Sequence, residues 1–149
     1  MTNKPATPED AQLILRLYEL RREDELRKAR AWYGSEFLPN SVDDVKAVWF
    51  DSKHPHNPHF RMVTTYWDMA ASFVTSGALN GELFLESSTE MIIAYAKVEP
   101  YLKDVREQSG FTTYMGNIEK VIEQYPLAQQ KLAWAHVYVD RLKQRAAGQ

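Results

Sequence analysis

Apolar side chains recur at intervals of three and four residues along most of this chain, the spacing of one face of an α-helix. No segment shows the alternation with a period of two that a half-buried strand requires. The 149 residues include only 6 Gly and 7 Pro, which favours long regular elements over many turns. The sequence therefore predicts an all-α fold. We expect a single-domain bundle of about six helices over residues 1–149, with flexible ends at 1–6 and 147–149.

The composition argues against several classes of protein. Hydrophobic residues make up 44% and charged residues 26%, so neither a disordered chain nor a membrane protein is expected. The chain contains no cysteine, which removes disulfides and thiolate metal sites and fits a reducing compartment. The first residues lack the apolar segment of a secretory signal. We therefore expect a cytoplasmic protein.

The first helix is predicted to be long. Thr7 can cap it, and Pro8 stands in the first turn, where its missing N–H costs nothing. Two apolar stripes follow on faces displaced from each other, namely Leu13, Ile14, Leu17 and Leu20, then Leu26, Ala29, Tyr33 and Phe37. Two helices broken near Asp24 would give the same pattern. Because no Gly or Pro lies between the stripes, we predict one helix that ends near Phe37.

Capping and breaking residues divide the rest of the chain. The expected elements are a short helix opened by Ser41, an apolar helix over 60–76, a short helix capped by Asn80, a helix over about 91–109, a helix from 112 or 113 to 125, and a last helix from Pro126. The wide apolar arc of 60–76 predicts a central helix with several neighbours. Pro100 must either kink its helix or begin a new one.

The sharpest chemical candidate is the segment DSKHPHNPHF at residues 51–60. His54, His56 and His59 fall within six residues, and neutral imidazoles suit Zn²⁺, Ni²⁺ or Cu²⁺. The spacing resembles the His-x-His-x-x-His signature of metallo-β-lactamase-like hydrolases. That signature has Asp where Pro58 stands here, and it follows a strand rather than a helix. We interpret the segment as a proline-stiffened loop and keep a metal-dependent enzyme as an alternative.

Two further titratable residues lie within predicted helices. The helical wheel places Asp68 on the polar face of the most apolar helix, which predicts an exposed or hydrogen-bonded structural carboxylate. His136 is predicted to be a partly buried histidine with a hydrogen-bond partner. The patterns Glu-x-x-His and His-Glu-x-x-His and a phosphate-binding loop are absent. We therefore expect no cofactor and no resident metal, and we assign no catalytic residue.

The expected partners follow from charge and from apolar patterning. A net charge of −2 and the interleaved acidic and basic residues of 16–30 argue against nucleic acid. The leading hypothesis is a non-enzymatic domain that contacts proteins, most simply a second copy of itself. The displaced stripes of the first helix motivate it, together with a small-residue seam on the last helix at Ala128, Leu132, Ala135, Val139, Leu142 and Ala146.

A third hypothesis is a helical sensor or carrier for an apolar ligand. It rests on a set of methionine and aromatic residues that we interpret mainly as core, namely Met62, Tyr66, Trp67, Met69, Phe73, Met91, Tyr95 and Tyr114. Such residues at helical spacing are needed for burial in a domain of this size. The ligand hypothesis therefore stays an alternative.

An aromatic-rich helix over 66–76 ends in Gly77-Ala78-Leu79, and a short helix with Leu83 and Phe84 follows. A longer segment then contains Tyr95, Pro100, Tyr101 and Arg106. This order resembles uncharacterised bacterial all-helical families. The resemblance covers about a third of the chain. It implies a bacterial helical domain without an assigned activity, and it transfers no functional residue.

Overall fold

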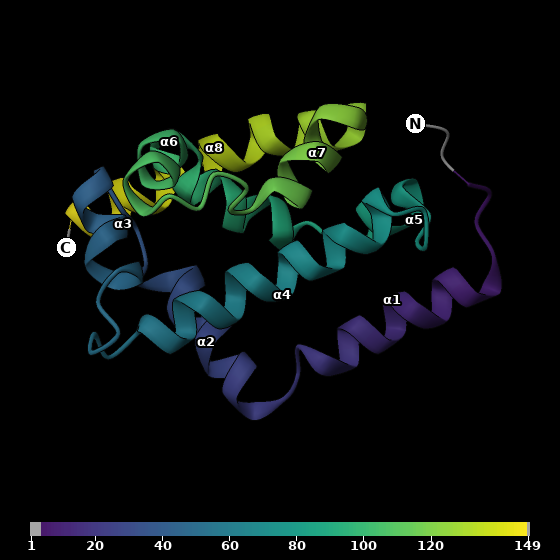
Figure 1. The fold of residues 1–149 in the computed structure, drawn as a ribbon, viewed down its shortest axis with the longest axis horizontal. Helices are drawn as coiled ribbons and strands as arrows, with labels where there is room; N and C mark the ends of the chain where they lie inside the picture. The colour runs from purple at the N-terminus through teal and green to yellow at the C-terminus, as the bar shows by residue number, and fades with distance from the viewer. Residues whose placement is uncertain (1–3, 149) are drawn as a thin grey trace.

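The computed structural model describes residues 4–148, and every regular element in that range is a helix (Figure 1). The helices are α1 (Pro8–Leu20), α2 (Asp24–Ser35), α3 (Val42–Trp49), α4 (Asn57–Thr75), α5 (Gly81–Ser87), α6 (Glu90–Ser109), α7 (Gly116–Gln124) and α8 (Pro126–Ala147). The predicted all-α class is confirmed. The expected count of about six helices is too low for the described residues, mainly because the first predicted helix is in fact two.

The central element is α4, as its wide apolar arc predicted. It contacts α2, α3, α6 and α7, and it runs through the middle of the molecule in Figure 1. Its buried side chains include Phe60, Val63 and Trp67, each with at most 1% of its surface exposed. A helix surrounded by neighbours must be apolar on most of its sides, which is what the sequence of α4 provides.

The prediction of one helix from Pro8 to Phe37 is wrong. The chain breaks between Leu20 and Asp24, and the Glu23 carboxylate accepts a hydrogen bond from the N–H of Leu26 at 3.0 Å, so Glu23 caps α2. The displaced stripes allowed the alternative of two helices broken near Asp24, but glutamate is not among the residues that usually cap helices, so that alternative was not preferred. The break lets the two displaced apolar stripes pack on different neighbours, α1 against α5 and α2 against α4.

Two other boundaries differ from the prediction. The helix α4 begins at Asn57 rather than Phe60, with Pro58 in its first turn, so His59 lies in the helix and not in the loop. The helix α7 begins at Gly116 rather than residue 112 or 113. Met115 precedes it with φ of 58°, a left-handed conformation that cannot continue a helix.

The helix α6 passes through Pro100 without ending, so one helix spans Glu90–Ser109 and no new helix begins there. It packs along α8, whose small residues Ala128 and Ala135 are fully buried. The seam predicted for the last helix is therefore used inside the fold from Ala128 to Val139, whereas its last member, Ala146, is exposed. Small side chains allow this close approach of helix axes.

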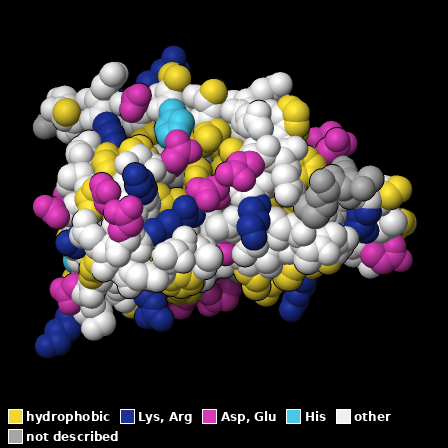
Figure 2. All heavy atoms as spheres, turned by 45° about the horizontal axis from the view of Figure 1, so that its top comes forward, with side chains coloured by type: hydrophobic (Ala, Val, Ile, Leu, Met, Phe, Trp, Pro, Cys, Tyr) yellow, Lys and Arg dark blue, Asp and Glu magenta, His cyan; other side chains and the backbone are white. Residues whose placement is uncertain are grey.

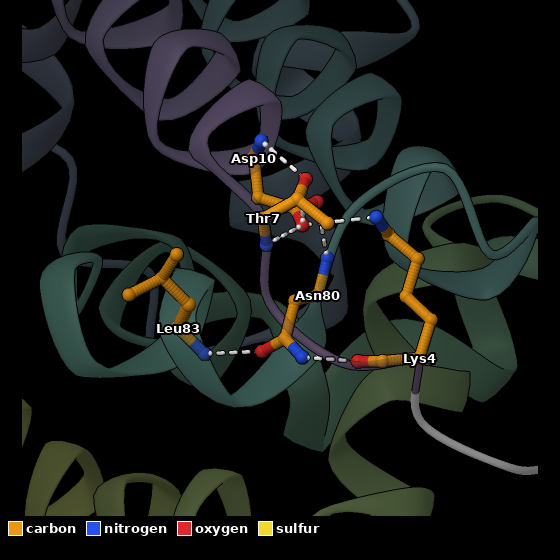
Figure 3. Close-up of polar contacts among 5 residues, drawn as sticks. All are labelled: Lys4, Thr7, Asp10, Asn80 and Leu83. Atoms are coloured by element: carbon orange, nitrogen blue, oxygen red, sulfur yellow. Dashed lines mark hydrogen bonds and ion pairs between the residues drawn. The ribbon is translucent and has the colours of Figure 1, made fainter.

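The start of α1 is held by one carboxylate (Figure 3). Asp10 is 1% exposed and accepts hydrogen bonds from Lys4 Nζ, from the N–H and hydroxyl of Thr7, and from the N–H of Asn80. Asn80 in turn accepts from the N–H of Leu83 at 2.8 Å, so it caps α5 as predicted. Residues 1–3 and 149 lie outside the described residues, and the flexibility of both ends stays a prediction.

Across residues 4–148, no helix is both long enough and apolar enough to cross a membrane. Figure 2 shows acidic and basic side chains interspersed on the face that carries α6, α7 and α8, with hydrophobic side chains between them. A mixed surface of this kind creates no strong field of one sign on that face.

Candidate binding cleft between α2, α6 and α8

A cleft of about 360 Å³ lies between α2, α6 and α8. Ala31 of α2, Val63 of α4, and Ile93 and Ala94 of α6 make its apolar wall. Val63 and Ala94 are buried core residues, so this wall is continuous with the hydrophobic core. The volume is within the range of small-molecule sites. The rest of the lining carries polar or charged groups, namely those of Arg27, Arg30, Tyr33, Glu90, Lys97 and Tyr138.

An ion pair crosses the cleft between α2 and α6. The Arg30 guanidinium donates two hydrogen bonds of 2.7 Å to the Glu90 carboxylate and a third, of 3.0 Å, to the carbonyl of Arg21. Arg21 itself lies 3.7 Å from Glu90. Planar pairing with a carboxylate is the strongest geometry open to arginine, and here it raises the pKa of Arg30 further. Glu90 is therefore neutralised within the fold.

Lys97 lies at the bottom of the cleft and is 1% exposed. Its ammonium donates to three carbonyls at the end of α2, those of Tyr33, Gly34 and Phe37. A lysine has three N–H donors, so all of them are used. Burial lowers the pKa of Lys97 to about 8, and nearby Lys143 adds to the effect. Because the last carbonyls of a helix have no partner within the helix, these hydrogen bonds from Lys97 stabilise the C-terminal end of α2.

Two polar groups of the cleft have no polar partner among residues 4–148. The Arg27 guanidinium forms neither an ion pair nor a hydrogen bond in this part of the chain, and the Tyr138 hydroxyl forms no hydrogen bond there. The ring of Tyr138 stacks on Trp134 with centroids 5.2 Å apart and planes 11° apart. Arg27 and Tyr138 are thus the groups of the cleft able to bind something from outside.

An open groove continues the cleft along α2 and α8. Four residues line both spaces, namely Arg30, Ala31, Gly34 and Tyr138. Beyond them the groove is lined by Leu38, in the segment after α2, and by Leu142 and Arg145 of α8, among others. A ligand longer than the cleft therefore has an apolar path with a second arginine beside it.

The lining of the cleft offers no hydroxyl or thiol of Ser, Thr or Cys and no imidazole. Its acid and its lysine already have partners. Nucleophilic catalysis needs a nucleophile within reach of a base. Such a pair is missing from the residues that line this cleft.

The three histidines of the predicted loop lie at the start of α4, but they do not converge on one point. His56 Nδ1 lies 3.2 Å from His59 Nδ1, whereas His54 Nδ1 accepts a hydrogen bond from the backbone N–H of His56. The ring of His56 stacks on Trp32 at 4.6 Å. Over residues 4–148, no three His, Cys, Asp or Glu side chains are grouped so that they could hold a metal ion. The arrangement favours a structural role.

The predictions for Asp68 and His136 are confirmed. The Asp68 carboxylate accepts hydrogen bonds from the N–H groups of Asn117 and Ile118, at 3.1 and 3.2 Å, and so caps α7. His136 is partly buried, and its Nε2 lies 3.0 Å from a Glu99 carboxylate oxygen. Both residues join helices that are distant in the sequence.

The cleft itself was missed in the sequence. Its residues come from four helices, and Arg30 and Glu90 are sixty positions apart. One signal was present. Gly34 lies in the last turn of α2, and a glycine in a helix interior destabilises the helix by about 1 kcal/mol relative to alanine. An added Cβ at Gly34 would meet no atom within 4 Å, so packing does not require glycine there.

Comparison with known proteins identifies a family. Residues 6–125 match the family described as a domain of unknown function, DUF4760. Searches of curated proteins and of solved structures found no match. The matched range includes α2 and α6, whereas α8, which contributes Tyr138, follows it. The matched range covers most of the chain, and the protein therefore belongs to the DUF4760 family of domains of unknown function.

Proposed function

We propose that this protein is a non-enzymatic binding domain whose site is the cleft between α2, α6 and α8. One observation carries the proposal: a cleft of about 360 Å³ with an apolar wall presents two polar groups that have no polar partner among the described residues, those of the exposed Arg27 and the half-buried Tyr138. Apolar walls with few polar groups are typical of small-molecule sites. As parts of the same proposal, we place the protein in the bacterial cytoplasm and expect no nucleic-acid partner.

The paired state of the other polar groups supports binding over catalysis. Glu90 is held by Arg30, and the ammonium of Lys97 is held by three carbonyls. A group that must exchange protons with a substrate needs a position from which it can reach that substrate. These side chains instead fix the relative positions of α2 and α6, and so preserve the shape of the cleft.

A ligand screen with a blocked variant tests the proposal. Ala31 is exposed and lines the cleft, and Ala31→Phe would fill it. Ala133 is equally an exposed helical alanine but does not line the cleft, so Ala133→Phe is the matched control. We expect compounds that raise the melting temperature of the wild-type protein and of Ala133→Phe, but not of Ala31→Phe. Equal stabilisation of all three proteins would contradict the proposed site.

A second candidate function is self-association through α8, because an apolar face of this helix is left uncovered. Trp134 and Val137 are each 50% exposed, and the stack of Trp134 on Tyr138 holds the indole in place. The displaced stripes and the α8 seam lend it little support, because most of their residues pack within the fold, whereas Leu20 and Ala146 are exposed. Exposed aromatic side chains are common centres of protein interfaces.

Sedimentation velocity at micromolar concentration tests self-association. The variant Trp134→Ser/Val137→Ser should sediment as a monomer if the wild type is a dimer through this face. Phe111 is 53% exposed in the turn before α7, so Phe111→Ser controls for the loss of an exposed aromatic side chain. A wild-type monomer, or a dimer that survives the double substitution, would contradict the second candidate.

A further inference from the structure

Gly34 is a helical glycine that the folded chain itself does not explain. It lies inside α2, its φ is outside the left-handed region, and a Cβ built on it would meet nothing within 4 Å. Glycine inside a helix is destabilising, but it lets another molecule approach the backbone closely. Gly34 lines both the cleft and the adjoining groove. Its position points to a ligand that passes directly over α2.

The charge of the ligand follows from the groups that remain available. Glu90 is neutralised by Arg30, and Lys97 has no donor left. Arg27 is exposed, has no partner of opposite charge among residues 4–148, and lines the cleft together with Tyr138. A guanidinium fork matches the two oxygens of a carboxylate, and a phenol hydroxyl can donate to the same group. An anion is therefore the complementary ligand group.

The shape of the ligand follows from the apolar residues. Ile93 and Ala94 line the inner cleft, and Leu38 and Leu142 line the groove beyond Gly34. A compact ion such as phosphate would leave this path unfilled. An unbranched apolar chain would cover it and bury apolar surface along its whole length.

We propose that the cleft binds a small amphipathic carboxylate, with the carboxylate at Arg27 and an unbranched alkyl chain running over Gly34 towards Leu38 and Leu142. This assignment rests on the proposed function, because it uses the same cleft. It adds the chemical class of the ligand and its direction in the site. Arg145, at the far end of the groove, would then lie beside the chain and not at the carboxylate.

Calorimetric titration with three probes of equal chain length tests the charge. Decanoate, decanol and decylamine differ in the head group alone. We expect decanoate to bind more tightly than decanol, and decylamine to bind least. Arg27→Gln should weaken decanoate binding by about tenfold and leave decanol unchanged, because one charge-assisted contact is lost. Arg141 is exposed on α8 and lines neither the cleft nor the groove, so Arg141→Gln is the control, with binding of decanoate within about twofold of wild type. Decylamine binding as tightly as decanoate, or no effect of Arg27→Gln, would overturn the assignment.

Gly34→Leu tests the path of the chain. The leucine side chain would occupy the groove, and its Cβ would clash with no other atom of the protein. The melting temperature of Gly34→Leu should therefore equal or exceed that of wild type. We expect this variant to lose both decanoate and decanol binding. Wild-type affinity in Gly34→Leu would overturn the path over α2.

The two proposals can fail separately. If compounds from the screen stabilise the wild-type protein but not Ala31→Phe, and decanoate does not bind, then the ligand class is wrong and the proposed function stands. If neither decanoate nor any compound of the screen binds the cleft, both the ligand class and the proposed function are contradicted.

Discussion

The guanidinium of Arg30 and the carboxylate of Glu90 meet in two hydrogen bonds of 2.7 Å, one residue from α2 and the other from the first turn of α6. This pair spans sixty positions of sequence and forms part of the lining of the cleft. Both side chains keep some contact with solvent, with 23% and 32% exposed. The contact therefore fixes the distance between two helices without burying an uncompensated charge.

Removing this ion pair should loosen the two helices. We expect Arg30→Gln to lower the free energy of unfolding by about 1 to 2 kcal/mol, because two charge-assisted hydrogen bonds are lost at a partly exposed site. Urea unfolding of Arg30→Gln, Glu90→Gln and the double variant gives the coupling energy. A coupling energy near zero would show that the two residues act independently and would contradict this role.

The buried amine of Lys97 should titrate close to neutrality. Burial lowers its pKa from the usual 10.5 to about 8, which NMR of the lysine side chains can measure directly. Between pH 8 and 10.5 the unfolded chain then binds more protons at this residue than the folded chain does. The contribution of Lys97 to the free energy of unfolding should therefore rise with pH across that range.

The matched comparison is between Lys97→Met and Lys103→Met, because Lys103 is exposed on the same helix. We expect Lys97→Met to lower the free energy of unfolding by about 1 to 3 kcal/mol at pH 7, where Lys97 is still an ammonium, since three carbonyls lose their donor. Lys103→Met should change it by less than about 0.5 kcal/mol. A lysine spectrum in which every amine titrates above pH 10 would rule out the lowered pKa.

Asp10 should make the protein sensitive to acid. The ammonium of Lys4, aided by the N–H groups of Asn80 and Thr7, holds the pKa of Asp10 well below its usual range. The folded state therefore binds this proton less readily than the unfolded state, and the resulting stability is present above about pH 4 and lost as the pH falls further. Asp10→Asn should melt below wild type at pH 7, with a difference that shrinks towards pH 2.

Asp104 is exposed on α6, and Asp104→Asn provides the comparison for removal of a carboxylate. Its melting temperature should follow that of wild type at each pH. Thermal unfolding between pH 2 and pH 7 measures all three proteins. A constant difference between wild type and Asp10→Asn over this range would contradict the lowered pKa of Asp10.

Asp68 should stabilise the start of α7. Its carboxylate accepts from two N–H groups that the helix leaves without partners, those of Asn117 and Ile118. We expect Asp68→Ala to lower the free energy of unfolding by about 1 to 2 kcal/mol, and Asp68→Asn to lower it by less, because the amide oxygen still accepts. Hydrogen exchange at Asn117 and Ile118 should accelerate in Asp68→Ala. Unchanged exchange there would exclude the cap.

Local signals in the sequence were enough for most helix ends. Thr7, Ser41 and Asn80 cap helices as predicted, because each accepts from a backbone N–H three residues later, an interaction that depends on nearby residues alone. The break before Asp24 was missed, since Glu23 caps α2 without belonging to the preferred capping residues. The start of α7 was placed too early because Met115 adopts a left-handed conformation that its side chain does not announce.

The candidate binding cleft could not be predicted from patterns of neighbouring residues in the sequence. The three histidines are close together in the sequence, which predicts a possible metal site. In the structure His56 stacks on Trp32 and lies within hydrogen-bonding distance of His59, and the described residues form no three-ligand group. The residues of the cleft, in contrast, are far apart in the sequence and close together in the structure. Arg27, Glu90 and Tyr138 are unremarkable in their own segments and gain a role when α2, α6 and α8 meet. Contacts of such long sequence separation depend on tertiary packing that periodicity does not encode.

The cleft is tested most directly by isotope-filtered NOE measurements on the labelled protein with unlabelled decanoate. Contacts should appear between the alkyl chain and the methyl groups of Ala31 and Ile93, which line the inner cleft, and of Leu142 in the groove. They should disappear in Gly34→Leu. Contacts confined to the exposed Trp134 and Val137 face of α8, or a complete absence of intermolecular contacts at saturating decanoate, would contradict a binding site between α2, α6 and α8.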